Sequence, residues 1–200
     1  IALYLLPTPP NQRVSPFDLY RPQTCVQIMP GASDPSSMML PQQPLHKCLL
    51  PNASRYTSFS AATNPFQCDL GGFRLLGHSG QPINDMIRYC VGAPDDRSKA
   101  ELDALQRTLE WSHIAPSAPD TLPAYPSVTC DPFVLNDFDC PHILFAGNQT
   151  AYATRVVKDD AGREVRLLTL PSFGATGIAV LLNLATCEPH PIRFSTAGTV

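Results

Sequence analysis

Ile143-Leu144-Phe145-Ala146-Gly147-Asn148-Gln149-Thr150 joins an apolar run to a glycine turn made of small polar residues. The same pattern occurs earlier in the chain, where the apolar run 25–29 leads into Pro30-Gly31-Ala32-Ser33-Asp34-Pro35. A short apolar run bounded by turn residues is typical of a buried strand. The sequence therefore predicts two buried strands, 25–29 and 143–146, each ending at a short polar loop.

These two loops resemble the metal-binding loops of calcineurin-like metallophosphoesterases with the ligands missing. That family carries Gly-Asn-His-Asp/Glu in the first loop and Gly-His-x-His in the second, where Asn and His bind two metal ions. The corresponding residues here are Gly31-Ala32-Ser33-Asp34 and Gly147-Asn148-Gln149-Thr150. An alanine methyl cannot bind a cation, and Ser, Asn and Thr replace imidazole poorly at a transition-metal site. The resemblance therefore implies a degenerate phosphoesterase fold with no metal and no cofactor.

Length and charge limit the possible functions. The chain has 200 residues, which suits one domain with a sizeable core, or most of one. Its 14 basic and 17 acidic residues give a net charge of −3, without any run of basic residues. Binding nucleic acid alone requires clustered Lys and Arg that displace counterions, so we expect DNA contact only within a larger complex. No apolar stretch has the length of a membrane span, and we expect no membrane association.

The other apolar patterns predict further strands in a proline-rich chain. Gly71-Gly72 separates two strand-like runs and indicates a hairpin, whereas 31–65 has the composition of a loop. The predicted strands are 66–70, 73–76, 151–157, 163–170, 178–184 and 192–195, with 159–162 as a four-residue hairpin loop. Many strands, few helices and long connections favour an α/β or α+β sandwich.

One helix is predicted, from Ala100 to Trp111. Leu102, Leu105 and Leu109 recur at the spacing of one helix face. Glu101 and Asp103 are expected in its first turn, where negative charge suits the helix dipole.

Seven cysteines without a CxxC pair argue against a zinc ribbon. A secreted disulfide framework also fits a chain of this size poorly. We predict reduced, mostly buried thiols in an intracellular protein.

Isolated candidates for ligands or bases remain in the loops. Asp34 is the only residue of the first loop that can still bind a metal or act as a base, and its other interpretation is a turn carboxylate. Asn148 either caps a strand end or binds a ligand. His113 precedes a loop, where phosphoesterases often have a metal-binding His, but one His cannot assemble a dinuclear site. The sequence contains no nucleophile elbow, phosphate-binding loop or cysteine with an identifiable base, so we predict no catalytic residue.

Longer motifs support a more specific resemblance, running from about Val26 to Gly198. The most distinctive blocks are Leu40-Pro41-Gln42-Gln43-Pro44-Leu45-His46 and His113-Ile114-Ala115-Pro116-Ser117-Ala118-Pro119-Asp120-Thr121-Leu122. Shorter matching stretches are 29–31, 34–35, 63–67, 76–77, 79–81, 85–89, 140–142, 147–148, 170–173 and 191–195. With these motifs the chain resembles the C-terminal half of the small, non-catalytic B subunits of replicative DNA polymerases, those of polymerase delta in particular.

The resemblance implies a domain organisation. Such proteins combine an oligonucleotide/oligosaccharide-binding barrel with an inactive phosphoesterase domain. Residues 25–200 would be the C-terminal part of the phosphoesterase domain, incomplete at its N-terminus, with the barrel absent from this chain. Residues 1–24 are expected to be a proline-rich lead-in outside the resemblance. Because the chain starts without Met, we expect a fragment, and a domain without its first strands should be unstable alone.

The implied function is that of an accessory subunit in DNA replication. The domain would act as a scaffold that bridges the Cys-rich C-terminal region of the catalytic subunit and a further accessory subunit, in the nucleus. Two alternatives remain open. One is a residual metal-dependent phosphodiesterase or nuclease, and the other is the equivalent small subunit of polymerase alpha or epsilon.

Overall fold

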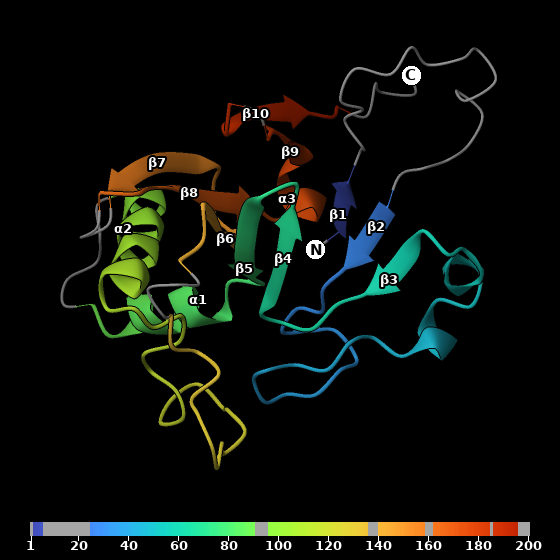
Figure 1. The fold of residues 1–200 in the computed structure, drawn as a ribbon, viewed down its shortest axis with the longest axis horizontal. Coiled ribbons are helices and arrows are strands. Elements are labelled where there is room, and N and C mark those ends of the chain that lie inside the picture. The colour runs from blue at the N-terminus through green and yellow to red at the C-terminus, as the bar shows by residue number, and fades with distance from the viewer. Residues whose placement is uncertain are drawn as a thin grey trace.

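A mixed five-stranded sheet forms the centre of the protein in a computed structural model that describes residues 2–5, 25–90, 96–135, 140–158, 162–184 and 186–195 (Figure 1). The strand order is β4-β5-β6-β8-β7. The strands are β4 (Phe66–Leu70), β5 (Phe73–His78), β6 (Ile143–Gln149), β7 (Ala153–Lys158) and β8 (Glu164–Pro171). The sheet confirms the predicted mixed α/β class.

The two outer strand pairs of the sheet are antiparallel and the two inner pairs are parallel. β4 and β5 pair antiparallel across Gly71-Gly72, and both glycines have positive φ, as a two-residue hairpin turn requires. β7 and β8 also pair antiparallel, as predicted, although residues 159–161 of their connection lie outside the described residues. β6 pairs parallel with β5 and with β8, so these three strands end at the same edge of the sheet.

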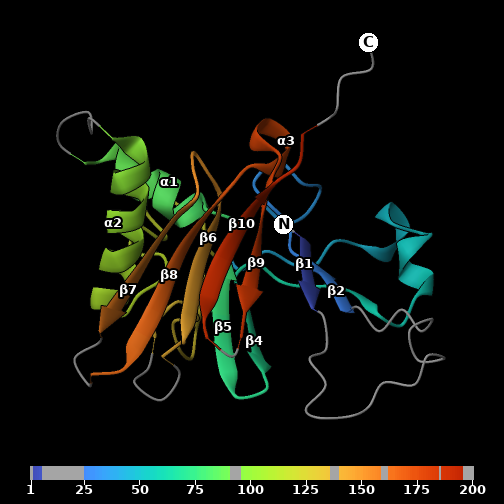
Figure 2. The same cartoon turned by 90° about the horizontal axis from the view of Figure 1, so that it is seen from above.

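Different layers cover the two faces of the sheet (Figure 2). Helices α1 (Gln81–Arg88) and α2 (Arg97–Glu110) pack on one face. The ribbon of β9 (Ile178–Asn183) and β10 (Glu188–Arg193) packs on the other. Leu144 faces the helices while Phe145 belongs to the core under the ribbon, the two-residue alternation of a strand. Residues 143–147 of β6 are buried on both faces, which explains the continuous apolar run in this part of the strand.

A small second sheet lies beside β4 and corrects one expectation, that of an entirely irregular segment 31–65. It has the order β1-β2-β3, with β1 (Ala2–Leu5), β2 (Cys25–Ile28) and β3 (Phe59–Ala61). The segment 31–65 is therefore not entirely loop, because β3 pairs parallel with β2. The expected lead-in 1–24 contains β1, which pairs antiparallel with β2. Short 3₁₀ turns at Lys47–Leu49 and Ala53–Arg55 complete this part of the chain.

The helices also depart from the predictions. The side chain of Asp96 caps α2 by accepting the N–H of Lys99 at 3.3 Å, so the helix begins at Arg97 rather than Ala100. Glu101 therefore lies outside the first turn, with Asp103 after it, and the expected interaction of these acids with the helix dipole was wrong. The predictions missed α1, although Pro82 near its start is a known helix-start signal. A one-turn helix, α3 (Phe173–Thr176), precedes β9.

Two further expectations concern β6 and the thiols. β6 does not end at Gly147 but continues to Gln149, with an irregular register against β8. The cysteines are not mostly buried: four side chains are exposed and three are partly buried. Among the described residues, no helix combines the length and apolar character that crossing a membrane requires.

Candidate functional site

The two polar loops singled out in the sequence meet in the structure. A Cβ atom placed on Gly31 would lie 3.5 Å from Asn148 Nδ2 and 3.5 Å from Asp34 Oδ2. The parallel strands β5 and β6 end here together, and Asn148 Nδ2 donates a hydrogen bond of 3.0 Å to the carbonyl of Ser79. This edge of the sheet, where Gly31, Asp34, Ser79 and Asn148 converge, is the candidate site.

Each polar side chain of the candidate site has a local structural role. Asp34 Oδ2 accepts the backbone N–H of Gly31 at 2.7 Å, the turn geometry suggested by the sequence. Asn148 holds the end of β6 with a left-handed φ of 52°, a conformation that Asn tolerates better than most residues. Ala32 and Ser33 are exposed. Asp34 is thus the one carboxylate that the converging loops bring to this edge.

Thr150, the last residue of the second loop, binds a residue of helix α2 rather than a residue of the first loop. Its N–H and its hydroxyl both donate to Glu101 Oε2 of α2, at 2.9 and 2.5 Å. Glu101 is only 1% exposed, and its other oxygen lies 3.2 Å from Nε of Arg97. Bonds to an ionised acceptor are stronger than neutral ones, so this contact fastens the start of α2 to the end of β6.

A network of uncharged amides lies beneath the candidate site. Asn64 Nδ2 has three acceptors within 2.9 Å, on Gln42, Ser79 and Gln81. Asn64 Oδ1 accepts the N–H of Ser79 at 3.0 Å. Gln42 Nε2 donates to the carbonyls of Gly31 and Ser37, at 3.3 and 2.9 Å. These side chains satisfy one another with neutral groups, which is how buried polar groups avoid a desolvation penalty.

No sequence pattern predicted this buried network. Gln42 lies in the distinctive Leu40–His46 block and Asn64 precedes a proline, but nothing in the sequence indicated that they would meet. Both are at most 1% exposed. Two glutamines surrounded by leucine and proline were the available signal, since amides are rarely fully buried without partners.

His113 lies far from the candidate site. It follows the C-terminal end of α2, whereas Thr150 binds near the start of that helix, and the rise of an α-helix puts roughly 14 Å between Glu101 and Glu110. His113 Nδ1 accepts the N–H of Ala115, so its ring proton is on Nε2, which lies 3.1 Å from Asp131 Oδ2. Desolvation opposes ionisation of Asp131, but the N–H of Phe133 and the contact with His113 outweigh it and lower the pKa of this carboxyl.

His78 is a titratable residue directly before Ser79 of the buried network. It is fully buried at the end of β5, and desolvation lowers its pKa to about 4. Its Nδ1 accepts the N–H of Gly80 at 3.0 Å, which places the ring proton on Nε2. A neutral histidine held by its own chain turn is a structural group rather than an acid or base.

The described residues offer little to a metal ion. Within them, no group of three or more His, Cys, Asp and Glu side chains comes close enough to hold one. The candidate site combines one carboxylate with amides and hydroxyls, whereas dinuclear phosphoesterase chemistry requires several ligands around two metals. Its residues therefore do not fit a dinuclear transition-metal centre.

Comparisons with known proteins extend these observations. Relatives with similar sequences are the DNA polymerase delta small subunits of Arabidopsis thaliana, 46% identical, and of Oryza sativa subsp. japonica, 42% identical. DNA polymerase delta subunit 2 of Drosophila melanogaster is 41% identical. The alignments cover 86%, 86% and 85% of this chain but only 37%, 38% and 38% of these relatives, so the chain spans less than half of their length.

A family model also matches most of the chain. The match covers residues 11–155 and therefore starts inside the segment 1–24, which was expected to lie outside the resemblance. It includes both polar loops, the amide network and α2. The chain therefore belongs to the family of the B subunits of DNA polymerases alpha and epsilon.

Proposed function

We propose that this chain is part of a non-catalytic accessory subunit of a DNA polymerase delta complex. Support comes from the relatives, which are named as small or second subunits of DNA polymerase delta at 41–46% identity. Their names favour delta over the alpha and epsilon alternatives. The function is then structural, in DNA replication, and we propose a nuclear location.

We also propose that the fold is a phosphoesterase domain that has lost its metals. The observation that carries this proposal is the meeting of Gly31 and Asn148, which belong to the two loops that resemble metal-binding loops. Asp34 accepts a backbone N–H there, and amides of Gln42 and Asn64 lie behind it. A site built from backbone-bound and amide-bound side chains keeps the loops in shape without a cation.

Within the complex, the domain would serve as a rigid scaffold. We propose that it bridges the Cys-rich C-terminal region of the catalytic subunit and a further accessory subunit, and that it reaches DNA only through them. The net charge of −3 supports this indirect role, because a protein that binds DNA alone usually presents a basic surface.

Affinity purification of the tagged full-length protein from its native cells tests the subunit assignment. We expect the polymerase delta catalytic subunit at near-stoichiometric amounts. Recovery of a polymerase alpha or epsilon catalytic subunit instead would reassign the complex, and recovery of none would refute the proposal.

Measurements of bound metal and of phosphodiester cleavage test the proposed loss of metal binding and catalysis. After dialysis against Mn²⁺, the purified protein should hold well below one equivalent and should leave a bis(p-nitrophenyl) phosphate probe intact. Stoichiometric metal together with phosphodiester cleavage, both reduced by Asp34→Ala, would establish the residual nuclease instead.

A further inference from the structure

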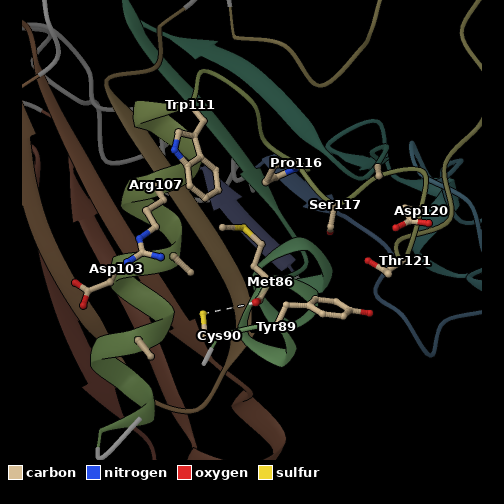
Figure 3. A pocket seen from close by; sticks show the side chains of 13 residues that line it. Met86, Tyr89, Cys90, Asp103, Arg107, Trp111, Pro116, Ser117, Asp120 and Thr121 are labelled. Atoms are coloured by element: carbon tan, nitrogen blue, oxygen red, sulfur yellow. Dashed lines mark hydrogen bonds between the residues drawn. The ribbon is translucent and has the colours of Figure 1, made fainter. Parts of the chain in front are cut away.

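A pocket of 680 Å³ opens between α1, α2 and the loop that follows α2, away from the polar loops (Figure 3). Its floor is apolar and includes Met86, Ala104 and Ala118. Two exposed aromatic side chains flank it: Tyr89 at the end of α1 is 61% exposed, and Trp111 at the end of α2 is 55% exposed. The volume lies in the range of pockets that bind ligands or anchor side chains.

The sequence explains why α2 forms one wall. Ala100, Ala104, Arg107 and Trp111 recur at intervals of three or four residues, so they share the helix face that does not pack on the sheet. Alanines near the start of this face leave space, and the long side chains near its end rise above it. Figure 3 shows Arg107 and Trp111 together on α2, with Met86 and Tyr89 of α1 across from them.

The opposite wall is held firmly in place. Thr121 Oγ1 donates a hydrogen bond of 2.6 Å to Asp85 Oδ2 of α1, and Asp85 is 4% exposed. The N–H of Thr121 donates to the carbonyl of Ser117 at 3.2 Å. The pocket is therefore pre-formed, which reduces the entropy cost of filling it.

The exposed guanidinium of Arg107 is a polar group of the pocket that a ligand can reach. Ser117 also lines the pocket, but its Oγ is shielded from solvent and has no hydrogen-bond partner among the described residues. The guanidinium of Arg107 has no ion-pair partner in the described part of the chain, whereas Asp103 is paired with Arg155 at 2.7 Å. The α2 side of the pocket thus carries one uncompensated positive charge. Asp120 puts a carboxylate on the loop side, where it would repel acidic groups.

We propose that this pocket docks a segment of a partner protein that inserts one bulky apolar side chain between Tyr89 and Trp111 and places a carboxylate on Arg107. Aromatic residues and arginine are the side chains most enriched at the energetic centres of protein interfaces. The inference deepens the proposed scaffold function and rests on it only in expecting a protein partner.

Trp111 gives a direct readout, because it is the single tryptophan of these 200 residues. The full-length protein is labelled with 5-fluorotryptophan, and the ¹⁹F resonance that the Trp111→Phe variant lacks is assigned to this residue. The probes are acetyl-Glu-Phe-Glu-amide, acetyl-Lys-Phe-Lys-amide, acetyl-Glu-Ala-Glu-amide and an oligo-dT strand.

We expect a saturable shift with the Glu-Phe-Glu peptide, at least tenfold weaker binding of the Lys-Phe-Lys peptide and no shift with the Glu-Ala-Glu peptide. Arg107→Gln should abolish the preference for acidic over basic peptide and keep the requirement for Phe. Leu181→Ala on β9, which alters a similarly exposed apolar residue outside the pocket, should leave every titration unchanged. Equal binding of both charged peptides, no saturable shift with any peptide, or a shift with oligo-dT alone would overturn the proposal.

The same variants separate this inference from the proposed function. If the wild-type protein recovers polymerase subunits and Trp111→Ala with Arg107→Glu recovers them equally, the docking inference fails alone. If no polymerase subunit is recovered but the peptides bind as expected, the subunit assignment fails alone.

Discussion

Glu101 and Thr150 are separated by 49 residues, yet one carboxylate oxygen of Glu101 accepts both the N–H and the hydroxyl of Thr150. In the proposed degenerate phosphoesterase fold, Thr150 takes the place of a metal-binding histidine, and its hydroxyl faces a buried acid. The contact joins the helical layer to the central sheet.

Removing the Thr150 hydroxyl should destabilise the fold. We expect Thr150→Val to lower the free energy of unfolding by about 1.5–3 kcal/mol, the usual range for a hydrogen bond to a charged group. Thr150→Ser retains the hydroxyl and should lose much less. Urea denaturation of the full-length protein measures both, and equal stability of the valine and serine variants would contradict this role.

Gly80 should tolerate no side chain. It has φ of 98°, and a Cβ atom would lie 2.0 Å from the Gly147 carbonyl oxygen. We expect Gly80→Ala to cost about 3 kcal/mol or more, from backbone strain and a clash with the backbone of β6. Gly71 also has positive φ but open space around it, so Gly71→Ala should cost only about 1 kcal/mol. Thermal unfolding measures the stability of both variants. Similar losses of stability would show that the ends of β5 and β6 can move apart to accommodate the side chain.

Two neighbouring glutamines provide a matched test of the amide network. Gln42 is 1% exposed and donates to two carbonyls, whereas Gln43 is exposed. Gln42→Leu should cost about 2–4 kcal/mol because it leaves buried polar groups unpaired, while Gln43→Leu should stay within about 0.5 kcal/mol. The shift of each variant's chemical denaturation midpoint from that of the wild-type protein measures the two losses. A neutral Gln42→Leu would mean that water replaces the lost bonds.

His78 should make stability depend on pH in the acidic range. Its pKa is about 4 in the folded protein because of desolvation, below the ordinary value of 6.5. The unfolded chain therefore binds the proton more readily, and stability falls as pH drops from 6.5 through 4, by about 3 kcal/mol in total. His78→Asn can still accept the Gly80 N–H but does not titrate. Its unfolding free energy, measured across this pH range, should decline less than that of the wild-type protein, and parallel profiles would refute this role for His78.

Local sequence patterns determined much of the framework. The Gly71-Gly72 turn, the leucine spacing of α2 and the apolar runs of β2 and β6 each predict their element, because side-chain periodicity and turn chemistry act over a few residues. α1 and the Asp96 cap of α2 were missed despite local signals, whereas the errors at β3 and at the end of β6 occurred where a distant contact decides. β3 exists through its pairing with β2, and β6 continues past Gly147 because β8 lies beside it.

The sequence likewise predicted only part of the candidate site. The sequence alone showed that Gly31-Ala32-Ser33-Asp34 and Gly147-Asn148-Gln149-Thr150 lack metal-binding histidines, since residue identity fixes ligand chemistry. Only the tertiary structure decided that Gln42, Asn64 and Ser79 form one buried network, that Glu101 holds Thr150, and that Tyr89 and Trp111 flank one pocket. Asn64 and Ser79 are 15 positions apart in the sequence, and Glu101 and Thr150 are 49 positions apart. They come together because strands and helices pack into layers, which no local sequence pattern encodes.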